Sequence, residues 1–139
     1  MANGNNDFTL SIKLKPEDSK TSLKEEFDEY YAVSIPGRNT GISYTSFKRY
    51  KGEIWTKDDI STSIQSDIIG EVWSHLVITK ADNQFSFYMN GELIDTKELS
   101  EQLYEYDNDY FYIGVGNPTL DSEQFYFKGL IAEFAIWNI

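Results

Sequence analysis

Hydrophobic and polar residues alternate along several short segments of this chain. Between Phe8 and Leu14 every second residue is apolar, and the residues between them are polar. Such alternation predicts a β-strand with one face in the core, because successive side chains of a strand point to opposite sides. By this pattern strands are expected at Phe8 to Lys15, Tyr30 to Ile35, Gly41 to Phe47, Glu53 to Thr56, Trp73 to Lys80, Phe85 to Asn90, Tyr110 to Gly116 and Gly129 to Trp137.

The same alternation assigns side chains to the core or to the outside. Trp73, at the head of an apolar strand, is expected in the core or at its edge. Tyr88, Tyr110 and Tyr112 are expected to point outward, where aromatic rings on neighbouring strands could form a platform. The residues expected to face the core are Phe8, Leu10, Ile12, Leu14, Phe85, Phe87, Met89, Phe111, Ile113 and Val115.

Turn-forming residues separate these strands. Asn90-Gly91 is the clearest case, because Asn-Gly favours the tight turns that close β-hairpins. Pro36-Gly37-Arg38-Asn39 and Gly116-Asn117-Pro118 also carry residues that reverse a chain. The charged segment from Lys20 to Glu29 fits either a helical turn or a loop. Short alternating runs without long helical periods favour an all-β sandwich.

Three segments together resemble a known family. They are Trp73 to Ile94 (WSHLVITKADNQFSFYMNGELI), Tyr112-Ile113-Gly114, and the closing run in which Phe127 and Gly129 precede Ile131, Glu133, Phe134, Ile136, Trp137 and Asn138. With FTLSIKLKP at Phe8 to Pro16, their order resembles the laminin-G-like and concanavalin A-like jelly-roll domains of lectins and glucanases. The resemblance implies one antiparallel jelly-roll β-sandwich over residues 1–139.

The start of the chain departs from that family pattern. Such domains usually have one or two strands before the FTLSIKL-like strand, whereas only Met1 to Asp7 precede it here. One sheet is therefore expected to lack a strand or to borrow one. We expect the domain to be excised from a longer multidomain protein.

Composition limits the classes of partner. With 139 residues and 40% hydrophobic content the chain can bury one core, so a single domain is expected. A net charge of −11 argues against binding to nucleic acid or to an anionic membrane, since both require a basic surface. No apolar run approaches the roughly 20 residues that span a bilayer, so membrane insertion is not expected.

The N-terminus and the absence of cysteine say little about the compartment. MANGNNDF has neither a basic start nor an apolar stretch, so either the protein is not exported by a secretory signal or the signal lies outside this sequence. Without cysteine, no metal site with thiolate ligands can form. The family resemblance implies an extracellular location, at a cell surface or a virion surface.

A sugar-binding site requires aromatic rings beside polar side chains. Sugar C–H faces stack on Trp and Tyr, while the hydroxyl groups need amide, carboxylate or guanidinium partners. Trp55 is the first candidate, because Glu53 and Lys57 flank it at strand spacing and Asp58 and Asp59 follow. The alternative is that the tyrosines only cover a sheet face. The other ligand-binding candidates are Tyr44, Tyr88 and Tyr112 for stacking, and Arg49, Asp58 and Asn117 for polar contacts.

Catalytic motifs are not found. Glucanases of this fold carry a Glu-x-Asp-x-x-Glu strand, but Glu26-Phe27-Asp28 is followed by Tyr31 where the second Glu belongs. The single histidine, His75, lies within a predicted strand, where it is expected to pack at the sheet edge or to hydrogen-bond across strands. We therefore expect a non-catalytic protein without catalytic residues.

Acidic loops could hold a structural calcium ion. Asp107 and Asp109 lie in one such loop and Asp121 in another, and carboxylate oxygens are the ligands that Ca²⁺ prefers. The spacing does not match an EF-hand, because the required glycine is absent. Solvated acidic loops are the alternative, and no other cofactor is expected.

The resemblance and the aromatic candidates together predict a lectin-like module that binds a carbohydrate, either a cell-surface glycan or a polysaccharide. The alternative is a protein-interaction, assembly or adhesion domain of a bacterial or phage surface protein, which would dock against neighbouring protein domains. The same fold can serve both roles, so the function has to be inferred from the binding site and not from the fold.

Overall fold

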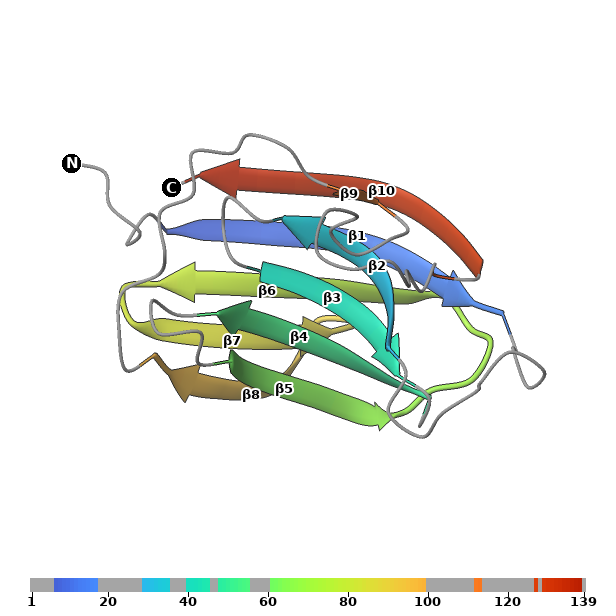
Figure 1. Cartoon of the computed structure of the whole chain (residues 1–139), viewed down its shortest axis with the longest axis horizontal. Helices are drawn as coiled ribbons and strands as arrows, with labels where there is room; N and C mark the ends of the chain where they lie inside the picture. Colours follow the sequence, from blue (N-terminus) through green and yellow to red (C-terminus); the bar gives the residue numbers. More distant parts are fainter. Residues whose placement is uncertain are drawn as a thin grey trace, which may run out of the picture.

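The computed structural model describes residues 7–17, 29–35, 40–45, 48–55, 61–99, 112–113, 127 and 129–138. These residues form two five-stranded antiparallel sheets that face each other (Figure 1). Sheet A has the order β10-β1-β6-β7-β8, and sheet B has the order β5-β4-β3-β2-β9. The strands are β1 (Phe8–Pro16), β2 (Glu29–Ile35), β3 (Thr40–Thr45), β4 (Arg49–Trp55), β5 (Ser61–Ile68), β6 (Ser74–Ala81), β7 (Gln84–Met89), β8 (Glu92–Glu98), β9 (Tyr112–Ile113) and β10 (Gly129–Asn138).

The expected all-β sandwich is confirmed, and each predicted strand segment overlaps an observed strand, although β4 begins at Arg49, four residues before the predicted Glu53. Two observed strands, β5 and β8, were not predicted. Their sequences, STSIQSDI and ELIDTKE, are mostly polar and lack a clear alternation. Both strands lie at a sheet edge, where little apolar surface needs to be buried, so their hydrophobic pattern is weak.

The core lies between the sheets and follows the predicted faces. Phe8, Leu10, Ile12 and Leu14 of β1 are fully buried. Phe85 and Phe87 of β7 are also fully buried, and Met89 packs against the core at its margin. Burying side chains of this size contributes about 1.5–3 kcal/mol each.

Tyrosine and glycine adjust the packing between the sheets. Gly52 of β4 faces Phe87 so closely that an added Cβ would lie 3.3 Å from the ring. Beside it, the rings of Tyr44 and Tyr50 pack with centroids 5.2 Å apart. Burial raises the pKa of Tyr50 above its ordinary value, and the nearby Tyr44 adds to the effect. Both rings therefore belong to the core.

Two core predictions are wrong. Ile113 is 45% exposed. It lies in β9, the last strand of sheet B among the described residues, which pairs with β2 only, where Ile113 is opposite the buried Val33. Trp73 is 47% exposed. It comes just before β6, and Ser74 is the first core-facing residue of that strand, so Trp73 points away from the core. Three further predictions of side-chain direction fall outside the described residues, those for Tyr110, Phe111 and Val115.

The predicted Asn-Gly turn is confirmed. Asn90 and Gly91 join β7 to β8 with φ values of 54° and 85°, the positive pair that a two-residue hairpin turn requires. The Asn90 side chain accepts a hydrogen bond of 2.8 Å from the His75 amide. His75 also makes the cross-strand contact expected of it, at 2.6 Å between its Nε2 and the Ser11 Oγ of β1.

Candidate functional site

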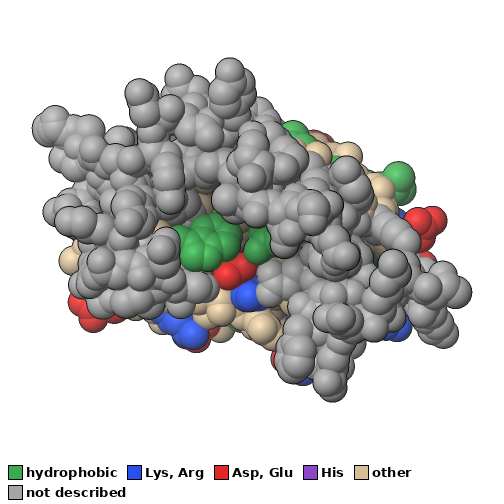
Figure 2. Space-filling view, viewed as in Figure 1, with side chains coloured by type: hydrophobic (Ala, Val, Ile, Leu, Met, Phe, Trp, Pro, Cys, Tyr) green, Lys and Arg blue, Asp and Glu red, His purple; other side chains and the backbone are tan. Residues whose placement is uncertain are grey.

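The outer face of sheet B carries the first sequence candidate. The side chains of Tyr50 and Ile54 in β4 point into the core, so Lys51, Glu53 and Trp55 point outward from the same strand. On this side of the molecule, hydrophobic, acidic and basic side chains lie next to one another (Figure 2). We call Tyr31, Lys51, Glu53 and Trp55 the Trp55 cluster.

A tyrosine from β2 completes this cluster. The Tyr31 hydroxyl donates a hydrogen bond of 3.1 Å to Glu53 Oε1. The ring reaches β4 by lying across Gly41 of β3, where an added Cβ would meet ring atom Cε1 at 3.4 Å. A larger residue at position 41 would push the ring away, so the glycine permits this contact.

Charge within the cluster is locally compensated. Lys51 Nζ lies 3.5 Å from Glu53 Oε2, and the exposed fractions of these side chains are 16% and 5%. Glu53 therefore forms a buried polar floor, and the partly exposed rings of Tyr31 and Trp55 lie at the surface. Such a site offers stacking surface, a positive charge and oxygen acceptors within one area.

A buried hydroxyl lies beside these groups. Ser43 of β3 stands between Tyr31 and Lys51 in the strand register and is fully buried. Its Oγ has no hydrogen-bond partner within the part of the chain that the structure describes. An unsatisfied buried hydroxyl costs about 1–3 kcal/mol. A ligand or water that reached it would recover part of that energy.

The remaining sequence candidates are dispersed. Arg49 shares the outward side of β4 with Trp55 but stands at the opposite end, and its Nη1 donates to the Ser66 carbonyl at 2.9 Å. Tyr88 points outward from β7, as predicted, but on sheet A. Tyr112 lies in β9, where it pairs with Ser34, and its side chain is not described.

Tyr44 requires a correction. It was expected on a sheet face as a stacking candidate, yet its ring is buried and its hydroxyl donates to the Ile69 carbonyl at 2.6 Å. In the register of β3 and β4, Tyr44 is opposite the core residue Tyr50, so its side chain faces the core as well. Its ring face is therefore occupied by the protein core.

The polar loop candidates Asp58 and Asn117 and the calcium candidates Asp107, Asp109 and Asp121 lie outside the described residues. Across the described ranges no group of three His, Asp or Glu side chains could hold a metal ion. Those ranges also contain no helix that is long and apolar enough to cross a membrane.

Comparison with known proteins places the fold. The family model described as the concanavalin A-like lectin/glucanases superfamily matches residues 1–139. A comparison with curated protein sequences gave no match.

Similar solved structures are toxin binding domains. The binding domain of Paraclostridial Mosquitocidal Protein 1 is 21% identical with a TM-score of 0.66, over 92% of this chain and 35% of that one. The binding domain of botulinum neurotoxin serotype D is 16% identical with a TM-score of 0.65, over 96% of this chain and 34% of that one. The receptor binding domain of the mosaic serotype C/D neurotoxin is 13% identical with a TM-score of 0.67, over 95% and 33%. The chain thus spans about a third of each of these structures.

Proposed function

Since the chain belongs to the concanavalin A-like lectin and glucanase superfamily, we propose that it is a non-catalytic carbohydrate-binding module. The observation that carries the proposal is the Trp55 cluster, in which two partly exposed aromatic rings flank a hydrogen-bonded carboxylate and ammonium group. A sugar needs this combination of a stacking face and polar partners. The ligand is a cell-surface or polymeric glycan.

Each group in the cluster has a defined role in this proposal. The indole of Trp55 stacks against the C–H face of a sugar ring. Lys51 donates to a sugar hydroxyl, while Glu53 holds Tyr31 and Lys51 in position through its two oxygens. Because Tyr31, Glu53 and Lys51 already contact one another before a ligand binds, little entropy of these side chains is lost on binding.

The site supports binding rather than hydrolysis. Glycoside hydrolysis needs two carboxyl groups that flank one bond, and the cluster contributes one carboxylate, Glu53. That carboxylate is engaged by Tyr31 and Lys51. The similar toxin structures are binding and receptor-binding domains, and this likeness supports an extracellular or surface location for this chain as well.

Affinity at a single site is expected to be low. One stacked ring contributes about 0.5–1.5 kcal/mol beyond area burial. Tight attachment would therefore need several copies on one surface, where linked binding events raise the apparent affinity. A test should display the domain multivalently.

Replacing Trp55 by alanine is expected to weaken glycan binding about tenfold, which corresponds to about 1.4 kcal/mol. The measurement is an oligosaccharide array probed with the multivalent domain, with and without Ca²⁺. Leu93→Ala is the matched control, because Leu93 is 54% exposed on β8 of sheet A. It should bind like the unmodified domain.

Both variants should unfold at the temperature of the unmodified domain, so that lost binding reports the site. A folded multivalent domain that binds no glycan would contradict the proposal and favour the protein-interaction alternative. A strict Ca²⁺ requirement for glycan binding would indicate that the binding site lies in the acidic loops.

A further inference from the structure

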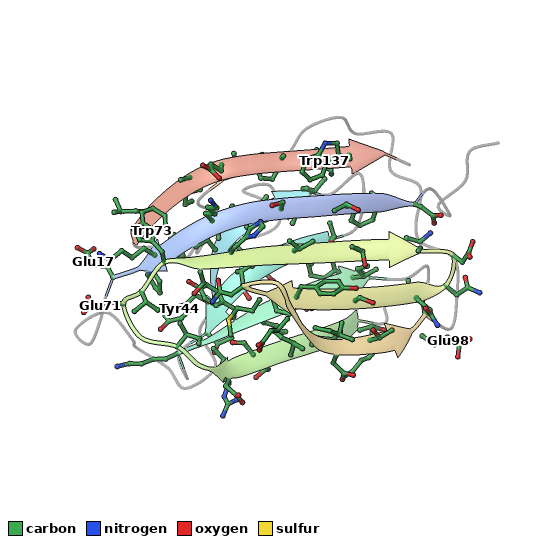
Figure 3. The ribbon with its side chains drawn as sticks, turned by 180° about the vertical axis from the view of Figure 1, so that it is seen from behind. Glu17, Tyr44, Glu71, Trp73, Glu98 and Trp137 are labelled. Carbon is green, nitrogen blue, oxygen red and sulfur yellow. The ribbon has the colours of Figure 1, made fainter. Side chains whose placement is uncertain are left out.

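The outer face of sheet A carries aromatic residues that the Trp55 cluster does not use. Trp137 of β10 is 53% exposed and Trp73 before β6 is 47% exposed. Figure 3 shows them at opposite ends of this sheet, with Trp137 towards the end of β10 and Trp73 near the loop that enters β6. Tryptophan side chains this exposed offer flat apolar faces on which a ligand ring can stack.

The strand register places both indoles on one side of the sheet. Trp137 pairs with Thr9 on β1, and Trp73 directly precedes β6, where Ser74 pairs with Leu14. Leu14 and Ser74 are buried, so Trp73, which precedes Ser74, faces outward. Thr9 lies between the buried Phe8 and Leu10, so Thr9 and the Trp137 opposite it face outward as well. The rows that hold Trp137 and Trp73 are six residues apart along β1, which corresponds to about 20 Å.

Polar side chains lie at the centre of this face, next to the apolar side chains of Val77 and Ala135, which pair with Ser11 on either side. The Ser11 hydroxyl and His75 Nε2 lie 2.6 Å apart, and Lys13 Nζ lies 2.8 Å from Glu133 Oε2. The hydrogen bond from Lys13, reinforced by its charge, lowers the pKa of Glu133. Thr9, which is opposite Trp137, and Thr79, on the other side of Thr9, add hydroxyl groups in the same row. Apart from Val77 and Ala135, the centre is thus polar, and it carries an internally compensated ion pair.

This order of residues distinguishes between two kinds of partner. The centre of a protein–protein interface is apolar and poor in charge, and its rim is polar. Here the centre carries hydroxyl groups and an ion pair, and the two tryptophan rings stand at the ends, with the exposed Leu130 in the row of Trp73. A polysaccharide fits that arrangement, because its rings stack on aromatic side chains while the hydroxyl groups between them need donors and acceptors. Although the net charge of the chain is −11, the central ion pair cancels, which suits a neutral ligand.

We propose that the outer face of sheet A, from Trp73 to Trp137, is a second carbohydrate surface that takes an extended neutral polysaccharide. It lies on the opposite side of the sandwich from the Trp55 cluster. One domain could therefore hold two polysaccharide chains, or two parts of one, without forming a dimer. Trp73 and Trp137 stack, and Ser11, His75 and Lys13 contact hydroxyl groups between them.

The test uses Trp55→Ala protein, so that the first site no longer contributes. This protein is mixed with insoluble cellulose, chitin or xylan, and the fraction removed from solution is measured. It should still bind at least one of the three polymers. Adding Trp73→Ala or Trp137→Ala should weaken that binding about tenfold, whereas adding Leu93→Ala should leave it unchanged.

Three results would overturn the proposal. They are no binding of Trp55→Ala protein to any of the three polymers, equal binding after either tryptophan is replaced, and a solution dimer of the unmodified domain that Trp137→Ala dissociates. The last result would identify the face as a protein interface. Because the oligosaccharide array tests the Trp55 cluster separately, failure of one site does not imply failure of the other.

Discussion

Replacing Gly129 by alanine should lower the free energy of unfolding by at least about 3 kcal/mol, the largest effect expected of an added methyl group at any glycine that the structure describes. Gly129 begins β10 with a φ of 147°, a conformation that side chains rarely adopt. An added Cβ would overlap the Lys15 carbonyl oxygen and lie 2.9 Å from Pro16 Cα. Strained backbone and overpacking each cost about 1–3 kcal/mol.

Two other glycines serve as controls for this urea-unfolding experiment. Gly91 has a φ of 85° but nothing within 4 Å of an added Cβ, so Gly91→Ala should cost only about 1 kcal/mol. Gly70 also has open space around it, and Gly70→Ala should be close to neutral. If Gly129→Ala were no more destabilising than Gly91→Ala, the result would contradict the close approach of β10 to the end of β1.

Replacing Asp7 by asparagine should destabilise the domain by about 2 kcal/mol, because it leaves a buried cation without its counter-ion. The Lys80 side chain is 1% exposed, and its Nζ lies 3.4 Å from Asp7 Oδ1. Lys80 is opposite Phe8 and Phe85 in the strand register, so its neighbours are largely apolar. Asp7 Oδ1 accepts a hydrogen bond of 2.8 Å from the Asp82 amide, and asparagine at position 7 keeps an oxygen that can accept it. The change therefore removes mainly the charge.

A second substitution separates the charge from the packing. Lys80→Met has a similar volume and no charge, so the Asp7→Asn and Lys80→Met double variant should recover most of the stability. Chemical unfolding of the two single variants and the double variant measures the effect. An unchanged stability in Asp7→Asn would show that the Lys80 ammonium group is hydrated and does not depend on Asp7.

The core strands could be predicted from the sequence because their alternation is uninterrupted. In β1 every second residue is apolar and buried, and the Asn90-Gly91 turn fixes the register of the next hairpin. Edge strands are harder to predict. β8 is mostly exposed and β5 is polar, so neither has the period of two that marks a half-buried strand.

The candidate site was only partly predictable for a related reason. Trp55 and Glu53 could be placed on one side of their strand from spacing alone. Tyr31 could not, because a register shift lies between Tyr31 and Val33 in β2. Regular alternation would put both residues on the same side, whereas the irregularity turns Tyr31 outward and leaves Val33 in the core. The contact of Tyr31 with Glu53 also requires the pairing of three strands, which no single segment encodes.

The central claim, that the Trp55 cluster binds a glycan, can be tested by NMR with the three tryptophan indole N–H signals as reporters. The oligosaccharide selected by the array would be titrated into the isotope-labelled domain, with each signal assigned by a Trp→Phe variant. The proposal predicts that the Trp55 indole and the Gly41 amide beneath the Tyr31 ring shift progressively, while Trp73 and Trp137 change little with this short ligand. Saturable binding that leaves the Trp55 and Gly41 signals in place would contradict it.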